Sequence, residues 1–353
     1  MHDSRKEYPR SLDATALLDS RVLVDTRSER TTGHPRLFNV AIAPDGKTVA
    51  AGGEGGIIHV IDVTSGDSSL ISSPRGNIES LHFSKSENLL YTCSDHGVIA
   101  IRSLLDHSMV RSKELPSSRG IYCSILDAVA GILYTGSLNG MIHALNASTL
   151  VSMWEWETYQ CRGVLSLYQP RSGEECLLAG RVDGVVLKLM AKDHGNGLRD
   201  TGVKVHEGPV FSLTPVQSTG KIITAGMDGC ICLLDTREML IESRIDTRQG
   251  KVLDVISVSR NHPVAGAIAG EMVGTSSPPH RLPLILAAGG DGTIAGYILD
   301  GHGNFIHAGF WWNAHEKTVE KFALDDKHGR LYTVSSDGRM KMWRMARSPS
   351  SEP

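Results

Sequence analysis

The chain has 353 residues, of which 41% are hydrophobic and 21% charged, and its formal net charge at pH 7 is −3. This charge argues against a nucleic-acid-binding protein with an overall basic surface. No apolar run reaches the roughly 18 residues that a membrane-spanning helix requires. The first 21 residues carry charges where a secretory signal would be apolar, and their acids disfavour a mitochondrial transit peptide. We therefore expect a cytoplasmic protein that is not secreted, with the nucleus as an alternative.

One pattern occurs seven times along the chain: an apolar run, a stretch of small residues, a turn ending in glycine and a second alternating run. In chain order the turn glycines are Gly56, Gly97, Gly140, Gly184, Gly229, Gly292 and Gly338. They lie 41 to 46 residues apart, except for one interval of 63 residues between Gly229 and Gly292. Alternation on both sides of such a turn predicts two paired strands, because glycine supplies the positive φ that a tight turn needs.

Each of the seven hairpins follows another short apolar run, and a weaker strand separates one unit from the next. The preceding runs begin at residues 37, 78, 121, 164, 210, 252 and 319. Each unit therefore contains four strands. A lone strand, RVLVDT at residues 21–26, precedes the first unit, and the chain ends soon after the third strand of the last. We expect these two ends to pair, since an open sheet edge invites aggregation.

Seven four-stranded units at this spacing resemble the WD-repeat β-propeller family over about residues 21–345. Gly33-His34 matches the Gly-His of that family, whereas the Trp-Asp dipeptide that names it is nowhere intact. The resemblance implies an all-β fold, a single seven-bladed propeller of four-stranded blades, closed by residues 21–26 pairing with the last blade. It also implies buried polar networks in the blades, formed by His34, His206, Asp228, His315, Asp337 and Trp343.

The segments outside the repeats are short. We expect residues 1–20 to form a flexible N-terminal extension and residues 346–353 a disordered tail, in which Ser348 precedes a proline and is a candidate phosphorylation site. The long interval is caused by residues 261–281, which fall between the first and second strands of the sixth unit. This segment is either a mobile surface loop or a partner-binding arm on the bottom face.

The resemblance also implies where a partner would bind. In this family each inner strand has a conserved aliphatic residue, and the residue just after it lies at the mouth of the central channel on the top face. The seven residues at this position form a ring around the mouth. Here these residues are Phe38, Glu79, Tyr122, Leu165, Phe211, Leu253 and Glu320. A second ring lies just before each hairpin turn and consists of Glu54, Asp95, Leu138, Val182, Met227, Gly290 and Ser336. Units three to five supply an apolar arc and units one, two and seven supply acids, so we expect a partner segment with apolar anchors and a basic flank. The alternative is that bulky side chains simply fill the channel.

No catalytic motif, paired carboxylates or metal-ligand spacing appears in the sequence, and the six cysteines include no Cys-x-x-Cys. Gly46-Lys47-Thr48 ends like a phosphate-binding loop, but Ala41 stands where that loop needs its first glycine. We expect no cofactor, metal or small-molecule substrate. The hypothesis favoured is a non-catalytic scaffold or adaptor that binds other proteins in a multi-subunit complex. The alternatives are a receptor for a short linear peptide motif and, less favoured, a propeller enzyme. Direct nucleic-acid contact would have to use Arg339, Lys341, Arg344 and Arg347.

Overall fold

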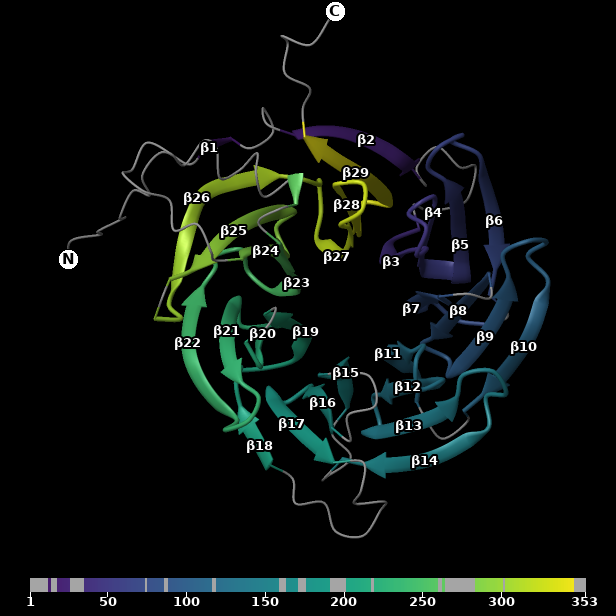
Figure 1. Cartoon of the computed structure of the whole chain (residues 1–353), viewed down its shortest axis with the longest axis horizontal. Coiled ribbons are helices and arrows are strands. Elements are labelled where there is room, and N and C mark those ends of the chain that lie inside the picture. The colour runs from purple at the N-terminus through teal and green to yellow at the C-terminus, as the bar shows by residue number, and fades with distance from the viewer. Residues whose placement is uncertain are drawn as a thin grey trace, which may run out of the picture.

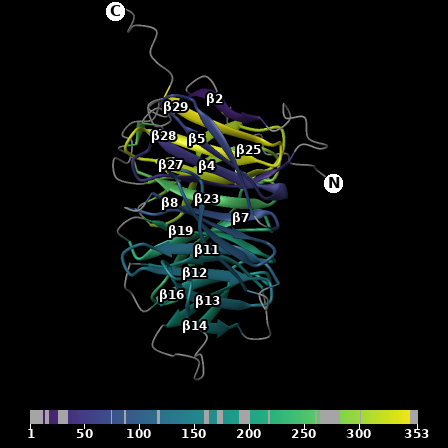
Figure 2. The same cartoon turned by 90° about the vertical axis from the view of Figure 1, so that its right-hand side faces the viewer.

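The computed structural model describes most of the chain and forms a ring of seven β-sheets around a central channel (Figure 1). The residues that it describes are 12–13, 18–25, 35–73, 75–85, 88–115, 119–158, 163–170, 176–190, 201–216, 219–259, 262–263, 283–300 and 302–345. The strands run across the disc from one face to the other (Figure 2). The predicted seven-bladed all-β propeller is confirmed.

The first four blades each contain four strands in sequence order, from the channel outwards. Blade one contains β3 (Leu37–Ile42), β4 (Thr48–Gly53), β5 (Ile57–Asp62) and β6 (Ser68–Ser72), with a short 3-10 turn, η3 (Glu54–Gly56), between β4 and β5. Blade two contains β7 (Ile78–Phe83), β8 (Leu89–Ser94), β9 (Val98–Ser103) and β10 (Met109–Glu114). Blade three contains β11 (Ile121–Asp127), β12 (Ile132–Ser137), β13 (Met141–Asn146) and β14 (Ser152–Glu157). Blade four contains β15 (Val164–Tyr168), β16 (Cys176–Arg181), β17 (Val185–Met190) and β18 (Thr201–Lys204).

The last three blades follow the same order, and the N-terminal strands join the final two. Blade five contains β19 (Val210–Val216), β20 (Lys221–Gly226), β21 (Cys230–Asp235) and β22 (Leu240–Asp246). Blade six contains β23 (Val252–Val258), β24 (Leu284–Gly289), β25 (Thr293–Leu299), β26 (Phe305–Asn313) and the two-residue β1 (Leu12–Asp13). Blade seven contains β27 (Val319–Asp325), β28 (Arg330–Ser335), β29 (Arg339–Met345) and β2 (Leu18–Asp25).

The ring closes as the sequence predicts, because β2 pairs antiparallel with β29 (Figure 1). The strand spans residues 18–25 rather than the predicted 21–26, since its ladder continues from Asp25 opposite Arg339 to Leu18 opposite Met345. Beyond it, β1 adds a parallel fifth strand to the outer edge of β26. The predicted N-terminal extension, residues 1–20, thus includes β1 and the start of β2, and its mobility stays a prediction.

The hairpin glycines explain why the repeats fold as blades. All seven have positive φ, between 72° and 87°. At Gly184 an added Cβ would lie 1.9 Å from the carbonyl oxygen of His206 in the following blade, so this turn excludes any side chain.

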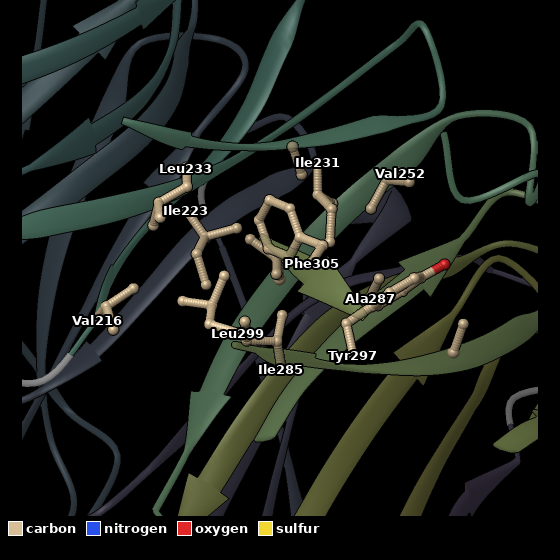
Figure 3. Packing of buried hydrophobic residues seen from close by; sticks show 13 residues of the cluster. Val216, Ile223, Ile231, Leu233, Val252, Ile285, Ala287, Tyr297, Leu299 and Phe305 are labelled. Carbon is tan, nitrogen blue, oxygen red and sulfur yellow. The ribbon is translucent and has the colours of Figure 1, made fainter. Parts of the chain in front are cut away.

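Hydrophobic side chains fill the spaces between neighbouring blades rather than one central core. Figure 3 shows the cluster between blades five and six, in which Ile231 and Leu233 of β21 pack near Ile285 of β24 and Tyr297 of β25. Trp154 and Trp156 lie on the same face of β14 and belong to the cluster between blades three and four, as the alternation predicts. The channel is therefore left to the side chains of the seven inner strands.

The long insertion lies between β23 and β24, as predicted, but residues 261 and 264–281 of it fall outside the described residues. Residues 262 and 263 are described: Pro263 packs on Gly329, and the His262 ring lies 3.4 Å from the Asp325 carbonyl oxygen. The tail predicted for residues 346–353 also lies outside the described part. Where the structure describes the chain, it contains no helix with the length and hydrophobicity needed to span a bilayer.

Candidate functional site at the channel mouth

The seven inner strands share one irregularity at the top of the channel. In β3, β7, β11, β15, β19, β23 and β27 the pairing register shifts between the first and third residues, so the second residue is bulged. A bulge leaves its residue without a direct partner and re-aims the side chain. The bulged residues are the predicted first ring: Phe38, Glu79, Tyr122, Leu165, Phe211, Leu253 and Glu320. All seven line one cavity of about 540 Å³.

The second predicted ring is tied to the first by the backbone. In six blades the residue before the turn donates its N–H to the carbonyl two positions before the bulged residue. Val182 donates to Gly163 at 2.9 Å, and Met227 donates to Pro209 at 2.9 Å. In these six blades the hairpin turn is therefore held beside the entry of its own inner strand, and the two rings form one surface.

The apolar half of this surface lies on blades three to five. Leu138 and Met227 are exposed, at 38% and 51%, while Val182 is half-buried. Below them Tyr122, Leu165 and Phe211 are half-buried in the cavity wall. The apolar side chains thus continue from the rim into the wall of the cavity.

The acidic half lies on blades one, two and seven. Burial raises the pKa of Glu79 to about 7, and the nearby carboxylates of Asp95 and Glu320 add to this effect. Burial also raises the pKa of Glu320, although its carboxylate accepts a hydrogen bond from the Ser336 hydroxyl. Glu79 and Glu320 are therefore two half-buried carboxyl groups that face the same space. Neither forms a salt bridge with another described residue.

One basic side chain already lies at this rim. The Arg36 guanidinium is 5.0 Å from the centre of the Phe38 ring and bonds the Glu54 carboxylate at 3.3 Å. Hydrogen bonding from the Arg36 backbone N–H, and then from its side chain, lowers the pKa of Glu54. The aromatic side chain of Phe38, one member of the first ring, is therefore already in contact with a cation.

A polar layer lies directly below the first ring, which the sequence analysis missed. The side chains two positions after each inner-strand start are Asn39, Ser80, Cys123, Ser166, Ser212, Asp254 and Lys321, and all line the cavity. The Lys321 ammonium lies 3.0 Å from Asp254, which also accepts from the Ser212 hydroxyl at 2.7 Å. The signal was present in the sequence as a recurring polar residue one position after each predicted ring residue.

A serine–histidine contact lies beside this layer in the wall of the same cavity, but its geometry does not support catalysis. His82 Nε2 lies 2.8 Å from the Ser124 hydroxyl and 3.1 Å from the Ser124 carbonyl oxygen. A carbonyl only accepts, so Nε2 carries the proton and cannot take one from the hydroxyl. The Ser124 hydroxyl donates to Ser80 at 2.7 Å. Burial lowers the pKa of His82 to about 4, which keeps the ring neutral. The contact joins blade two to blade three.

The predicted polar networks assemble in blades five and seven. His315 Nδ1 lies 3.0 Å from Asp337, and His315 Nε2 lies 2.7 Å from the Thr333 hydroxyl, which also accepts from Trp343 Nε1 at 2.9 Å. In blade five, His206 contacts Asp228 at 2.9 Å and Thr224 at 2.7 Å. His34 lies outside the described residues.

The remaining candidate features do not form a second site of the expected kinds. Within the described ranges, no three His, Cys, Asp or Glu side chains gather as metal ligands. Of the basic cluster near the C-terminus, Arg339 pairs with Glu316 at 2.8 Å and Lys341 donates to the Ala314 carbonyl at 2.5 Å. These two cations are therefore engaged within the protein.

Known proteins match both the repeat and the fold. The profile "WD40: WD domain, G-beta repeat" matches residues 26–62. A chain in "Crystal Structure of Mitotic Checkpoint Complex" superimposes with a TM-score of 0.69 at 16% identity, over 91% of this chain and 94% of that one. The chain thus shares one matched WD-repeat unit and the propeller fold with these proteins.

The similarity of the chain to a curated protein covers a smaller part of it. "Periodic tryptophan protein 2 homolog" of Dictyostelium discoideum is 25% identical over 234 residues, which make up 62% of this chain and 24% of that protein. The chain thus matches about a quarter of that relative's length. WD-repeat propellers typically serve as scaffolds for protein interactions and are usually not catalytic.

Proposed function

We propose that this propeller is a non-catalytic scaffold or adaptor that binds partner proteins at its channel mouth. The observation that carries the proposal is the division of the mouth into two arcs. Apolar side chains of blades three to five are partly exposed beside half-buried carboxyl groups of blades two and seven. An exposed apolar surface with a polar border is typical of an interaction site.

The partner that fits this surface is a segment with one or two apolar side chains followed by a basic one. The apolar side chains would enter the cavity between Tyr122, Leu165 and Phe211, which line it. The basic side chain would reach Glu79 and Glu320 across the channel. The resemblance to a chain of the mitotic checkpoint complex supports a role in a multi-protein assembly, while fold alone does not identify the complex.

The test is affinity purification with quantitative mass spectrometry, using the full tagged chain and two variants of the apolar arc, Phe211→Ser and Leu165→Ser. We expect both to lose a shared set of partners. The matched control is Leu240→Ser, because Leu240 is also exposed, at 61%, but lies at the start of an outer strand. Recovery of the same partners by wild type and by both mouth variants would refute the proposal.

A second candidate function, recognition of a short linear motif, is favoured by the Arg36–Phe38 contact. If the Phe38 ring and the acids accept a cation from a partner, Arg36 competes with that cation. A basic peptide should then bind saturably, and Arg36→Gln should strengthen its binding. Weaker binding by Arg36→Gln would show that Arg36 contributes to the site instead. We place the protein in the cytoplasm or nucleus as part of the same proposal.

A further inference from the structure

A second cavity, of about 730 Å³, lies between blades four and five, at the opposite ends of the strands from the channel mouth. Its wall is formed by the end of β17, the turn between β19 and β20, and the turn between β21 and β22. The volume is within the range of about 300–1,000 Å³ found for ligand-binding pockets. We call it the blade 4–5 crevice.

The floor of the crevice is apolar. Tyr168 ends the inner strand of blade four and Pro170 follows it, and Val216 and Ile222 belong to blade five. Met190, at the end of β17, is 40% exposed at the entrance. These side chains can bury an apolar group of a ligand, which is worth about 25 cal/mol per Å² removed from water.

The charges of the crevice all have the same sign. Lys188, Lys221 and Arg237 line it, whereas none of the described residues of its lining is acidic. The Lys221 ammonium lies 2.5 Å from the carboxylate of Glu242, which does not line the crevice, so this positive charge is already neutralised. Lys188 and Arg237 form no ion pair with a described residue, so the crevice presents two cations to a ligand, with the Asp235 carboxyl beside Arg237 as the nearest competing anion.

Lys188 is the decisive residue. Its side chain is half-buried between the blades, and its ammonium donates to the Thr236 carbonyl at 2.8 Å. No carboxylate of the described residues lies within ion-pair distance of it. An ammonium has three donors, and a partly buried charge is costly unless an opposite charge meets it.

We propose that the blade 4–5 crevice binds a segment of a partner protein that carries an anionic side chain beside a bulky apolar one. The anion lies between Lys188 and Arg237, and the apolar side chain lies on the floor. This site goes beyond the channel-mouth function, because its preferred ligand has the opposite charge and its residues are separate from those of the mouth.

The test begins with a random-peptide phage library selected on the full chain, followed by affinity measurements with synthetic peptides. We expect enriched peptides with Asp or Glu next to Leu, Ile, Phe or Tyr. Lys188→Glu and Arg237→Glu should each weaken their binding at least about tenfold, since the charged hydrogen bond is lost and repulsion replaces it. Peptides made with Asp, Asn or phosphoserine at the acidic position distinguish a carboxylate from a phosphate as the preferred anion.

The matched control is Lys113→Glu. Lys113 also donates to a carbonyl of the next blade, that of Leu150 at 2.8 Å, but it lines neither cavity. The Lys113→Glu variant should therefore bind the selected peptides as tightly as the wild type does. Arg237 is exposed, so Arg237→Glu keeps the test decisive if Lys188→Glu fails to fold. The proposal is overturned if no selected peptide depends on Lys188 or Arg237, if the dependent peptides lack acids, or if Asn replaces Asp without loss.

Discussion

Thr333 holds two buried side chains through one hydroxyl. It is fully buried and contacts both His315 Nε2 and Trp343 Nε1. We predict that Thr333→Val, which keeps the shape and removes the hydroxyl, lowers the free energy of unfolding by about 2–4 kcal/mol, because two polar groups lose their partner. Urea denaturation measures this.

Blade five supplies the control for that prediction. Thr224 contacts His206 in the same way, but Leu234 stands where blade seven has Trp343. Thr224→Val should therefore cost less, about 1–2 kcal/mol. Equal losses in the two blades would mean that the Trp343 hydrogen bond adds nothing.

Glu79 makes stability depend on pH. Burial raises its pKa from 4.5 to about 7, so the folded protein binds this proton more tightly than the unfolded chain. Its ionisation lowers the free energy of unfolding as the pH rises from about 5 through 7. Glu79→Gln should be more stable than the wild type at pH 8 by about 1–3 kcal/mol and equal to it at pH 5, by urea denaturation at both pH values.

The pKa of Glu54, at the same rim, is shifted in the opposite direction from that of Glu79. Its pKa is lowered, first of all by the Arg36 backbone N–H. Its ionised form is therefore favoured by folding, and Glu54→Gln should be less stable than the wild type at pH 8. If both variants shift in the same direction, the pH effect does not come from these local contacts.

At the scale of the element, β2 alternates between a packed and an exposed face. Leu23 packs against the cluster shared by blades seven and one, whereas Val22 is 46% exposed. We predict that Leu23→Asp lowers the free energy of unfolding by about 2–4 kcal/mol, since it places a charge against apolar side chains. Val22→Asp should change it by less than about 0.5 kcal/mol.

Urea denaturation and size-exclusion chromatography check this pair. If β2 leaves β29 in Leu23→Asp, the exposed edge should also promote aggregation. Equal stability of the two variants would mean that β2 contributes little to closure.

The elements differ in how well the sequence predicts them. The inner strands and hairpins have alternating apolar residues and a turn glycine, and all seven of each were predicted. In contrast, β1 has two residues and no periodicity, so only its position beside Phe310 and Trp311 identifies it. The start of β2 was missed because Asp19 and Ser20 do not look like a strand, although β29 provides partners for both.

The two proposed sites also differ in how well the sequence predicts them. The first ring could be named in advance because the WD-repeat resemblance gives one position in each inner strand, and the structure shows that this position is bulged. The crevice was not, since Lys188 and Arg237 are 49 positions apart in the sequence and meet only where two blades leave a gap. Which gaps remain unfilled depends on side-chain packing across blades, for which the sequence has no local pattern.

For the whole molecule, the two proposed sites lie at opposite ends of the strands and share no lining residue. We therefore predict independent binding. Phe211→Ser should leave the affinity of the crevice peptides unchanged within about threefold, and Lys188→Glu should leave the mouth partners unchanged. Fluorescence anisotropy with crevice peptides, and purification of mouth partners in their presence, test this. Mutual exclusion of the two ligands would contradict it.

The bulges at the top of the seven inner strands have a consequence for design. A bulged residue stands outside the regular pairing of its strand, so exchanging its side chain should disturb the sheet less than a change one position away. Seven such positions converge on one cavity. The propeller therefore offers a ring of replaceable side chains on a fixed frame, and a library varied only at residues 38, 79, 122, 165, 211, 253 and 320 could yield new binding specificities from one stable scaffold.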